Sequence, residues 1–143
     1  MPLASISPEE RYQIQEMNPF FTILSAAYIL GIFFLADSST AAQIGEFNPY
    51  SLLHIPLYGV LTGLLLLAFA SKPGTNIASR YHLAAWMAVA VGILDEYHQT
   101  FIPSREGSVG DVFLDILGVV LVVILARRVS PSLWLRPFQG RKM

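Results

Sequence analysis

Ionisable side chains gather between residues 95 and 115, in a part of the chain that is otherwise strongly apolar. They include Asp95, Glu96, His98, Arg105, Asp111 and Asp115, with the amide of Gln99 among them. Residues 83–94 contain no charged side chain, and residues 112–126 contain only Asp115. A charge near the centre of a bilayer costs about 2.5–3.5 kcal/mol on insertion scales, so acids in such segments usually have a role. The pattern indicates a polar site set into a membrane bundle, with a structural ion-pair network as the alternative.

These side-chain types support several kinds of chemistry. A carboxylate such as Asp95 or Glu96 can act as a catalytic base, and several carboxylates together can bind a divalent cation. No cofactor motif is evident, so a divalent cation is an option whose ligands stay unassigned. The imidazole of His54 can transfer a proton or join two helices by a hydrogen bond, and the guanidinium of Arg105 suits a carboxylate or a phosphate. The sequence contains neither H-E-x-x-H nor G-x-S-x-G, so it indicates neither a zinc protease nor a serine hydrolase.

The composition is that of a membrane protein. Hydrophobic residues make up 54% of the 143 residues and charged residues only 13%, about half the charged share of an ordinary soluble domain. Four apolar segments stand out, at about 20–36, 52–70, 81–101 and 111–126. A transmembrane helix needs roughly 17–25 residues. We therefore predict an all-α integral membrane bundle of four transmembrane helices, forming one domain over residues 1–143.

The basic residues predict how this bundle is oriented. Of the nine Lys and Arg residues, only Arg105 falls in the links after the first and third segments. The other eight are Arg11, Lys72, Arg80, Arg127, Arg128, Arg136, Arg141 and Lys142. Because basic residues are enriched on the cytoplasmic side, both termini should be cytoplasmic. The acidic residues and His54 then lie towards the outer face of the membrane.

Helical spacing predicts that polar side chains from three helices converge. At 100° per residue, Asp95, Glu96, His98 and Gln99 share an arc of about 160° on the third helix. Stripes at intervals of three or four residues are formed by His54, Tyr58 and Thr62 on the second helix, and by Asp111, Asp115 and Gly118 on the fourth. All three sets lie near the outer helix ends. We expect an outward-facing polar pocket there, formed by His54, Tyr58, Asp95, Glu96, Gln99, Arg105, Asp111 and Asp115.

Two local patterns concern the frame of this pocket. Ser108 and Asp111 have the spacing of a capping box, which predicts that the fourth helix begins after Ser108. Glycines within the predicted helices usually allow close helix packing. They are Gly59, Gly63, Gly92 and Gly118.

At these residues the chain resembles the VanZ-like family of small bacterial membrane proteins. The resemblance rests on Asp95-Glu96-x-x-Gln99, Pro103-x-Arg105 and Asp111-x-x-x-Asp115-x-x-Gly118, supported by His54-x-x-x-Tyr58. Two positions depart from the family pattern. Ser104 replaces the glycine often found before the arginine, and Asp115 stands where asparagine is common.

The resemblance implies a multi-pass protein of the bacterial cytoplasmic membrane, and for the founding member a role in resistance to the glycopeptide antibiotic teicoplanin. As a binding protein, this chain would recognise an envelope lipid, a lipid-linked wall precursor or a lipoglycopeptide. As an enzyme, it would be a hydrolase or transferase acting on such a substrate. A structural or interaction protein and a small proton-coupled transporter remain alternatives, the latter as an oligomer. A net charge of −1 gives no support for nucleic-acid binding, and the absence of cysteine excludes disulfides.

Overall fold

The computed structural model describes residues 17–36, 52–69, 77–103 and 107–129, which form four helices and no strand. The helices are α2 (Pro19–Ala36), α4 (His54–Ala68), α5 (Ile77–Gln99) and α6 (Val109–Arg128). The prediction of four helices is confirmed for these residues. The largest difference from the predicted bounds is at the start of α5, which begins at Ile77 rather than at residue 81.

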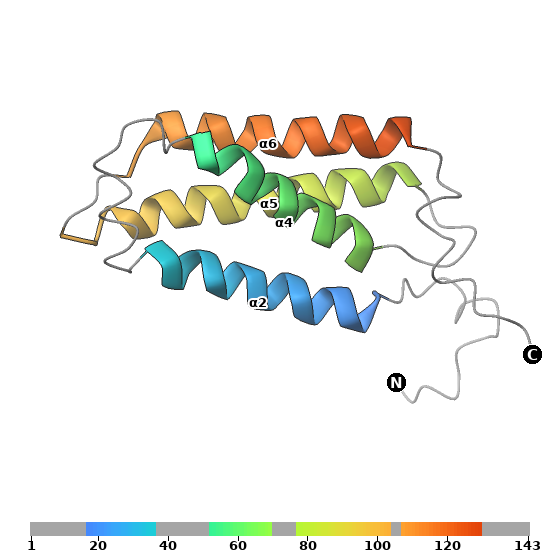
Figure 1. Cartoon of the computed structure of the whole chain (residues 1–143), viewed down its shortest axis with the longest axis horizontal. Helices are drawn as coiled ribbons and strands as arrows, with labels where there is room; N and C mark the ends of the chain where they lie inside the picture. Colours follow the sequence, from blue (N-terminus) through green and yellow to red (C-terminus); the bar gives the residue numbers. More distant parts are fainter. Residues whose placement is uncertain (1–16, 37–51, 70–76, 104–106, 130–143) are drawn as a thin grey trace, which may run out of the picture.

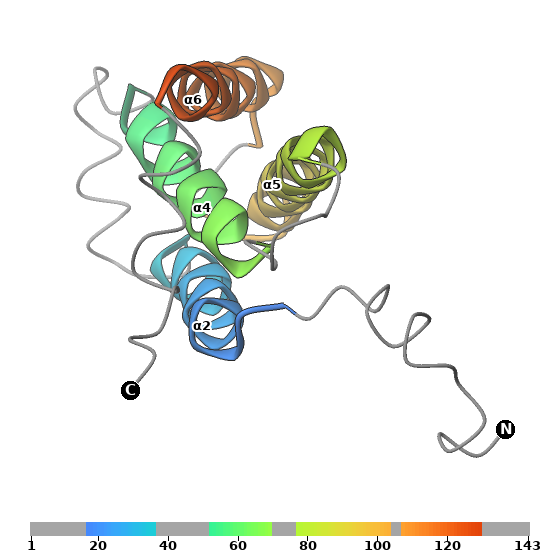
Figure 2. The same cartoon turned by 90° about the vertical axis from the view of Figure 1, so that its right-hand side faces the viewer.

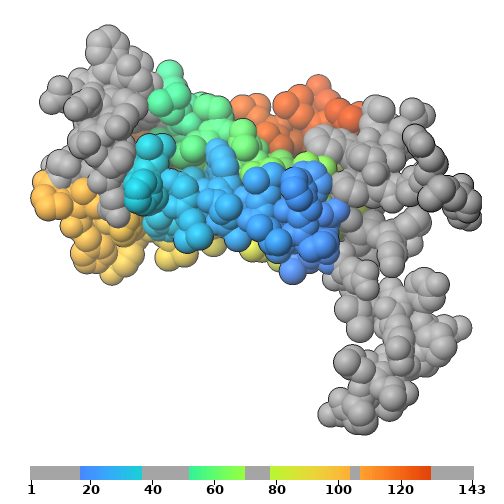
Figure 3. All heavy atoms as spheres, turned by 60° about the horizontal axis from the view of Figure 1, so that its bottom comes forward, coloured from blue at the N-terminus to red at the C-terminus, as the bar shows by residue number. Residues whose placement is uncertain are grey.

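Consecutive helices run in opposite directions along one common axis (Figure 1). The end view places α4 between α2, α5 and α6 (Figure 2). Figure 3 shows the outer face of α2 across one side of the molecule. The residues Ala36, His54, Gln99 and Val109 therefore share one end of the bundle, which we call the acidic end. The opposite end, at Pro19, Ala68, Ile77 and Arg128, is the basic end.

Local capping explains where α2 begins. The side-chain oxygen of Asn18 accepts hydrogen bonds from the backbone N–H groups of Phe20 and Phe21, at 3.1 and 3.3 Å. Pro19 occupies the first helical position, where a missing N–H removes no intrahelical bond. The N–H of Asn18 also donates to the carbonyl of Ala68 at 2.8 Å. This bond ties the start of α2 to the end of α4.

The core of the bundle is mostly aliphatic, and the buried acidic side chains among the described residues lie within it near the acidic end. The aliphatic part comes from α4, α5 and α6, with side chains such as Leu61, Ala88 and Val119. The outer faces are also apolar: Phe34 is 80% exposed and Trp86 is 72% exposed. Soluble proteins rarely expose large continuous apolar surfaces, which mark contact with a membrane or a protein partner. The exterior therefore has the character of a lipid-facing surface.

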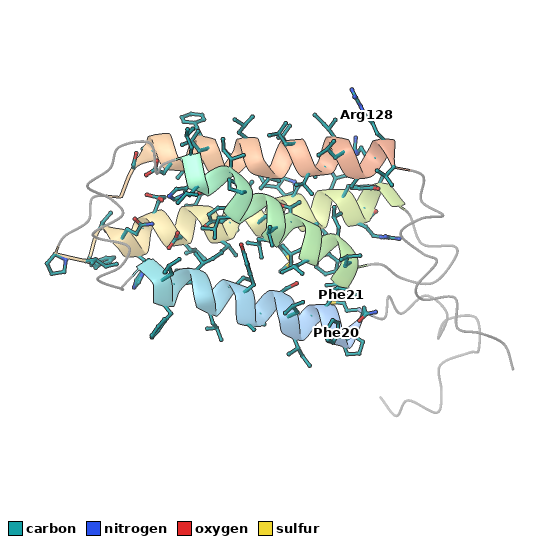
Figure 4. All side chains as sticks on the ribbon, in the orientation of Figure 1. Phe20, Phe21 and Arg128 are labelled. Carbon is teal, nitrogen blue, oxygen red and sulfur yellow. The ribbon has the colours of Figure 1, made fainter. Side chains whose placement is uncertain are left out.

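Charges are separated along the axis of the bundle. Within the described ranges, the three arginines Arg80, Arg127 and Arg128 lie near the basic end, and all four carboxylates lie near the acidic end. Figure 4 shows Arg128 at the basic end together with Phe20 and Phe21. The guanidinium of Arg127 lies 5.3 Å from the centre of the Tyr81 ring, a cation–π contact that holds it against α5.

Among the described residues, two helices are long and apolar enough to cross a membrane, α2 and α6. The apolar helix α4 has 15 residues and is shorter than the predicted segment 52–70. Helix α5 has 23 residues, but polar groups near both of its ends lower its apolar character. Four spans and the orientation of the termini therefore stay predictions. The general membrane character rests on α2, α6 and the apolar exterior.

Candidate functional site

A hydrogen bond between His54 and Asp115 joins α4 to α6 at the acidic end. His54 Nδ1 and Asp115 Oδ1 are 2.8 Å apart. His54 is the first residue of α4, and its side chain is 14% exposed, whereas the Asp115 side chain is 1% exposed. Pro56 follows within the first turn of α4, where proline is tolerated because the N–H groups have no intrahelical acceptor. The start of α4 thus places the His54 imidazole at the edge of the cluster, where the buried Asp115 carboxylate bonds to it.

A second set of bonds joins α4 to α5. The hydroxyl of Tyr58 donates to Asp95 Oδ2 at 3.2 Å, and Gln99 Nε2 lies 3.3 Å from the same oxygen. Both Tyr58 and Asp95 are buried. The Tyr58 ring also lies nearly parallel to the His54 ring, with 6.2 Å between ring centres. Asp95 is therefore enclosed by its neighbours.

Glu96 connects α5 to the start of α6. Its Oε2 accepts a hydrogen bond from the backbone N–H of Ser108 at 2.7 Å, and its Oε1 lies 3.3 Å from Gln99 Nε2. The same Glu96 Oε1 is 3.8 Å from His54 Nδ1. Glu96 therefore lies between the bonded pair His54–Asp115 on one side and the Gln99 amide on the other.

Ser108 caps α6, as its sequence context predicts. Its hydroxyl oxygen accepts from the N–H groups of Gly110 and Asp111, at 3.1 and 3.4 Å. A capping box would also direct the Asp111 side chain to the Ser108 N–H. In the structure that N–H bonds to Glu96 instead. The acceptor comes from another helix, so the spacing within residues 108–111 carried no signal for it.

Glycines allow the helices to approach each other beside these contacts. A methyl group on Gly118 would meet the backbone carbonyl of Ile55, and one on Gly92 would lie 2.6 Å from Asp115 Oδ2. At Gly59 it would lie 3.2 Å from a side-chain carbon of Val122. The predicted close packing is therefore found at these three glycines. It is wrong for Gly63, where nothing lies within 4 Å.

Asp111 is a further acidic residue of the cluster and lies at its partly exposed edge. One ligand atom from each of His54, Glu96 and Asp111 can be chosen so that all three lie within 4.8 Å of one another. Asp95 Oδ1 and Asp115 Oδ2 are buried and have no hydrogen-bond partner. Within the part of the chain that the structure describes, no Lys or Arg lies at this end. The described cluster therefore combines four carboxyl groups with no Lys or Arg.

The structure brings together most of the residues that the sequence proposes as a site. They are His54, Tyr58, Asp95, Glu96, Gln99, Asp111 and Asp115. Arg105 lies outside the described residues. The ring of His98 is 5.4 Å from that of Phe33 on α2, so this histidine packs away from the His54 side of α5. Thr62 donates its hydroxyl to the carbonyl of Tyr58 within α4.

The arrangement offers an oriented imidazole beside carboxylates of different exposure. A carboxylate that holds one ring nitrogen fixes the orientation of a histidine and leaves the other nitrogen for a proton or a metal. Asp115 occupies that position relative to His54. Glu96 and Asp111 supply oxygen ligands near it, whereas Asp95 is enclosed.

Together, the fold and this cluster define an all-helical protein of membrane character with buried acids near one end. A family model described as VanZ/LLP1 matches residues 20–133, and the chain belongs to that family. The matched region contains α4, α5, α6, all of α2 except Pro19, and every residue of the cluster. No curated protein and no solved structure matches the chain. The resemblance inferred from the sequence is therefore confirmed at the level of the family.

Proposed function

We propose that this chain is a multi-pass protein of the bacterial cytoplasmic membrane, with residues 1–143 forming one domain. In this proposal all four helices cross the membrane, both termini are cytoplasmic, and the acidic end faces outward. The separation of arginines from carboxylates along the bundle supports this orientation, because basic residues favour the cytoplasmic side. The apolar side chains on the outer faces support contact with lipid.

We further propose that the cluster binds the head group of an envelope lipid, a lipid-linked wall precursor or a lipoglycopeptide. The observation that carries this proposal is a cluster of acidic side chains in a bundle with an apolar exterior, with His54 and Asp111 at its partly exposed edge. Asp115 is six residues after the start of α6, which places it about 9 Å along the helix from that end. In the proposed orientation the cluster therefore lies near the outer end of an apolar bundle, where lipid head groups meet the protein.

An enzyme is the second candidate, and the bond between His54 and Asp115 favours it. A histidine oriented by a carboxylate can accept a proton from a water or hydroxyl nucleophile, as a hydrolase or transferase requires. Asp95 is enclosed by Tyr58 and Gln99, so His54 is better exposed for this role than Asp95. Incubation of the purified protein with total membrane lipid distinguishes the two functions. A new lipid species in the mass spectrum supports the enzyme, and unchanged lipids contradict it.

The orientation can be tested by cysteine labelling, since the natural chain has no cysteine. Val109 is the first residue of α6 and Val129 follows its last residue. Both are exposed, so Val109→Cys and Val129→Cys form a matched pair. We expect a membrane-impermeant maleimide to label Val109→Cys in intact cells, and Val129→Cys only after permeabilisation. The reverse pattern would place the acidic end inside and overturn the proposed orientation.

The cellular role can be tested by antibiotic susceptibility. A role of the teicoplanin-resistance type predicts that expression of the chain raises the teicoplanin concentration needed to stop growth. Glu96→Gln should remove this effect if it depends on the cluster. Equal loss of the folded protein and of the effect would favour a purely structural network.

A further inference from the structure

We propose that His54, Glu96 and Asp111 bind one first-row divalent cation, such as Zn²⁺ or Mn²⁺, with Asp115 orienting the imidazole. The three ligands come from the start of α4, the end of α5 and the first turn of α6. Their donor atoms lie within 4.8 Å of one another. This site deepens the envelope-ligand function proposed above, because a bound cation gives an acidic cluster affinity for a phosphate group. Its test requires no envelope ligand.

The surroundings of His54 match those of a metal-binding histidine. Such a histidine almost always donates its second ring N–H to a carboxylate or a carbonyl, which fixes the ring and raises its basicity. Asp115 Oδ1 lies 2.8 Å from His54 Nδ1 and is almost completely buried. Asp115 is outside the set of three ligands, so its position is that of the orienting partner.

The charge of the cluster provides an independent reason for a cation. Asp95 Oδ1 and Asp115 Oδ2 are buried oxygens without a hydrogen-bond partner. Asp115 adjoins the site through its bond to His54, whereas Asp95 lies on α5 with its other oxygen bonded to Tyr58 and Gln99. A buried carboxylate is strongly disfavoured unless a positive charge or a metal compensates it. A divalent cation supplies two such charges at one point.

The ligand types favour a borderline transition metal over calcium. Calcium prefers oxygen ligands alone, whereas imidazole suits zinc and its neighbours. Ligand atoms around tetrahedral zinc are about 3.3 Å apart, given bonds of about 2.0 Å. The three donor atoms here lie within 4.8 Å of one another, so they must move closer together to bind one metal. Asp111 is the ligand that would move, because its side chain is only half-buried in the first turn of α6.

The direct test is a titration of the full-length protein in detergent after removal of metals with a chelator. Co²⁺ serves as the probe because its visible absorption reports the ligands, and Zn²⁺ is then added as a competitor. We expect one Co²⁺ per chain, displaced by one Zn²⁺. Asp111→Asn and His54→Ala should weaken binding at least ~10-fold, and Asp115→Asn should weaken it by about 10–100-fold.

A matched control separates this site from a general effect on folding. His98→Ala removes a histidine that contacts Phe33 and lies outside the ligand set. It should keep one metal per chain. Helical circular dichroism should be the same for all variants, and Asp111→Asn, at a half-buried position, keeps the test decisive if His54→Ala does not fold.

Two results would overturn the metal site. One is no saturable Co²⁺ or Zn²⁺ binding by the folded wild type. The other is equal weakening by His98→Ala and Asp111→Asn. Either result leaves the cysteine-labelling test untouched, so failure of the metal site and failure of the proposed orientation are distinguishable.

Discussion

Replacing Gly118 by alanine should separate α4 from α6 beside the cluster. The added methyl group would meet the backbone oxygen of Ile55 and would lie 3.0 and 3.1 Å from its carbonyl carbon and its Cα. These atoms are backbone, so no side chain can rotate away, and the helices must move apart. His54 adjoins Ile55, and Asp115 lies three residues before Gly118. The movement should therefore lengthen the bond between His54 and Asp115.

The expected magnitude follows from the contact. Overpacking a well-packed interface costs typically 1–3 kcal/mol, and alanine recovers about 0.5–1 kcal/mol because it is a better helix former than glycine. A lost hydrogen bond adds about 0.5–1.5 kcal/mol. We expect Gly118→Ala to lower the free energy of unfolding by about 0.5–4 kcal/mol, measured by denaturant titration in detergent with circular dichroism as the signal.

Gly63→Ala on α4 is the matched control. Nothing lies within 4 Å of the position its methyl group would take, so the helix-forming advantage of alanine should act alone. Stability should stay the same or rise by up to about 1 kcal/mol. Equal stability of the two variants would refute the close approach of α4 and α6 at Gly118.

Three further predictions use the same unfolding measurement. Ser108→Ala should lose about 1 kcal/mol because the cap of α6 is removed, whereas Ser108→Thr should retain most of it. A double-mutant cycle of His54→Ala and Asp115→Ala should give a coupling energy of about 0.5–3 kcal/mol, and additivity would show that the pair does not interact. Tyr58→Phe should cost about 1–3 kcal/mol because the buried Asp95 carboxylate loses one of its two donors and keeps only Gln99. Tyr97→Phe, at an exposed position, should change stability by less than about 0.5 kcal/mol.

Helical periodicity and charge were sufficient to predict the helices and most of the cluster. The spacing of His54 and Tyr58, and of Asp111 and Asp115, places each pair on one face of its helix in any helical structure. The arc that contains Asp95 is fixed in the same way. Because consecutive helices are antiparallel, the start of α4, the end of α5 and the start of α6 meet at one end of the bundle, so the convergence follows from topology.

Contacts that depend on how the helices cross could not be predicted. His98 lies on the predicted polar arc, but it packs against Phe33 because α2 approaches that side of α5. The bond from the Ser108 N–H to Glu96 joins residues twelve positions apart and depends on where α6 begins. The selection of Asp111 rather than Asp95 as a neighbour of His54 also depends on these crossings. A single sequence carries no signal for such distances.

The central claim is that the cluster binds a lipid-anchored envelope molecule, and native mass spectrometry of the purified protein tests it most directly. Glu96→Gln is the variant of choice because glutamine retains an oxygen that can accept from the Ser108 N–H, and it loses only the longer bond accepted from Gln99. We predict that wild-type protein extracted from bacterial membranes in mild detergent retains an envelope lipid or precursor, and that Glu96→Gln loses it without loss of stability. The same retained lipids in both proteins, or lipid loss only in proportion to unfolding, would contradict the claim.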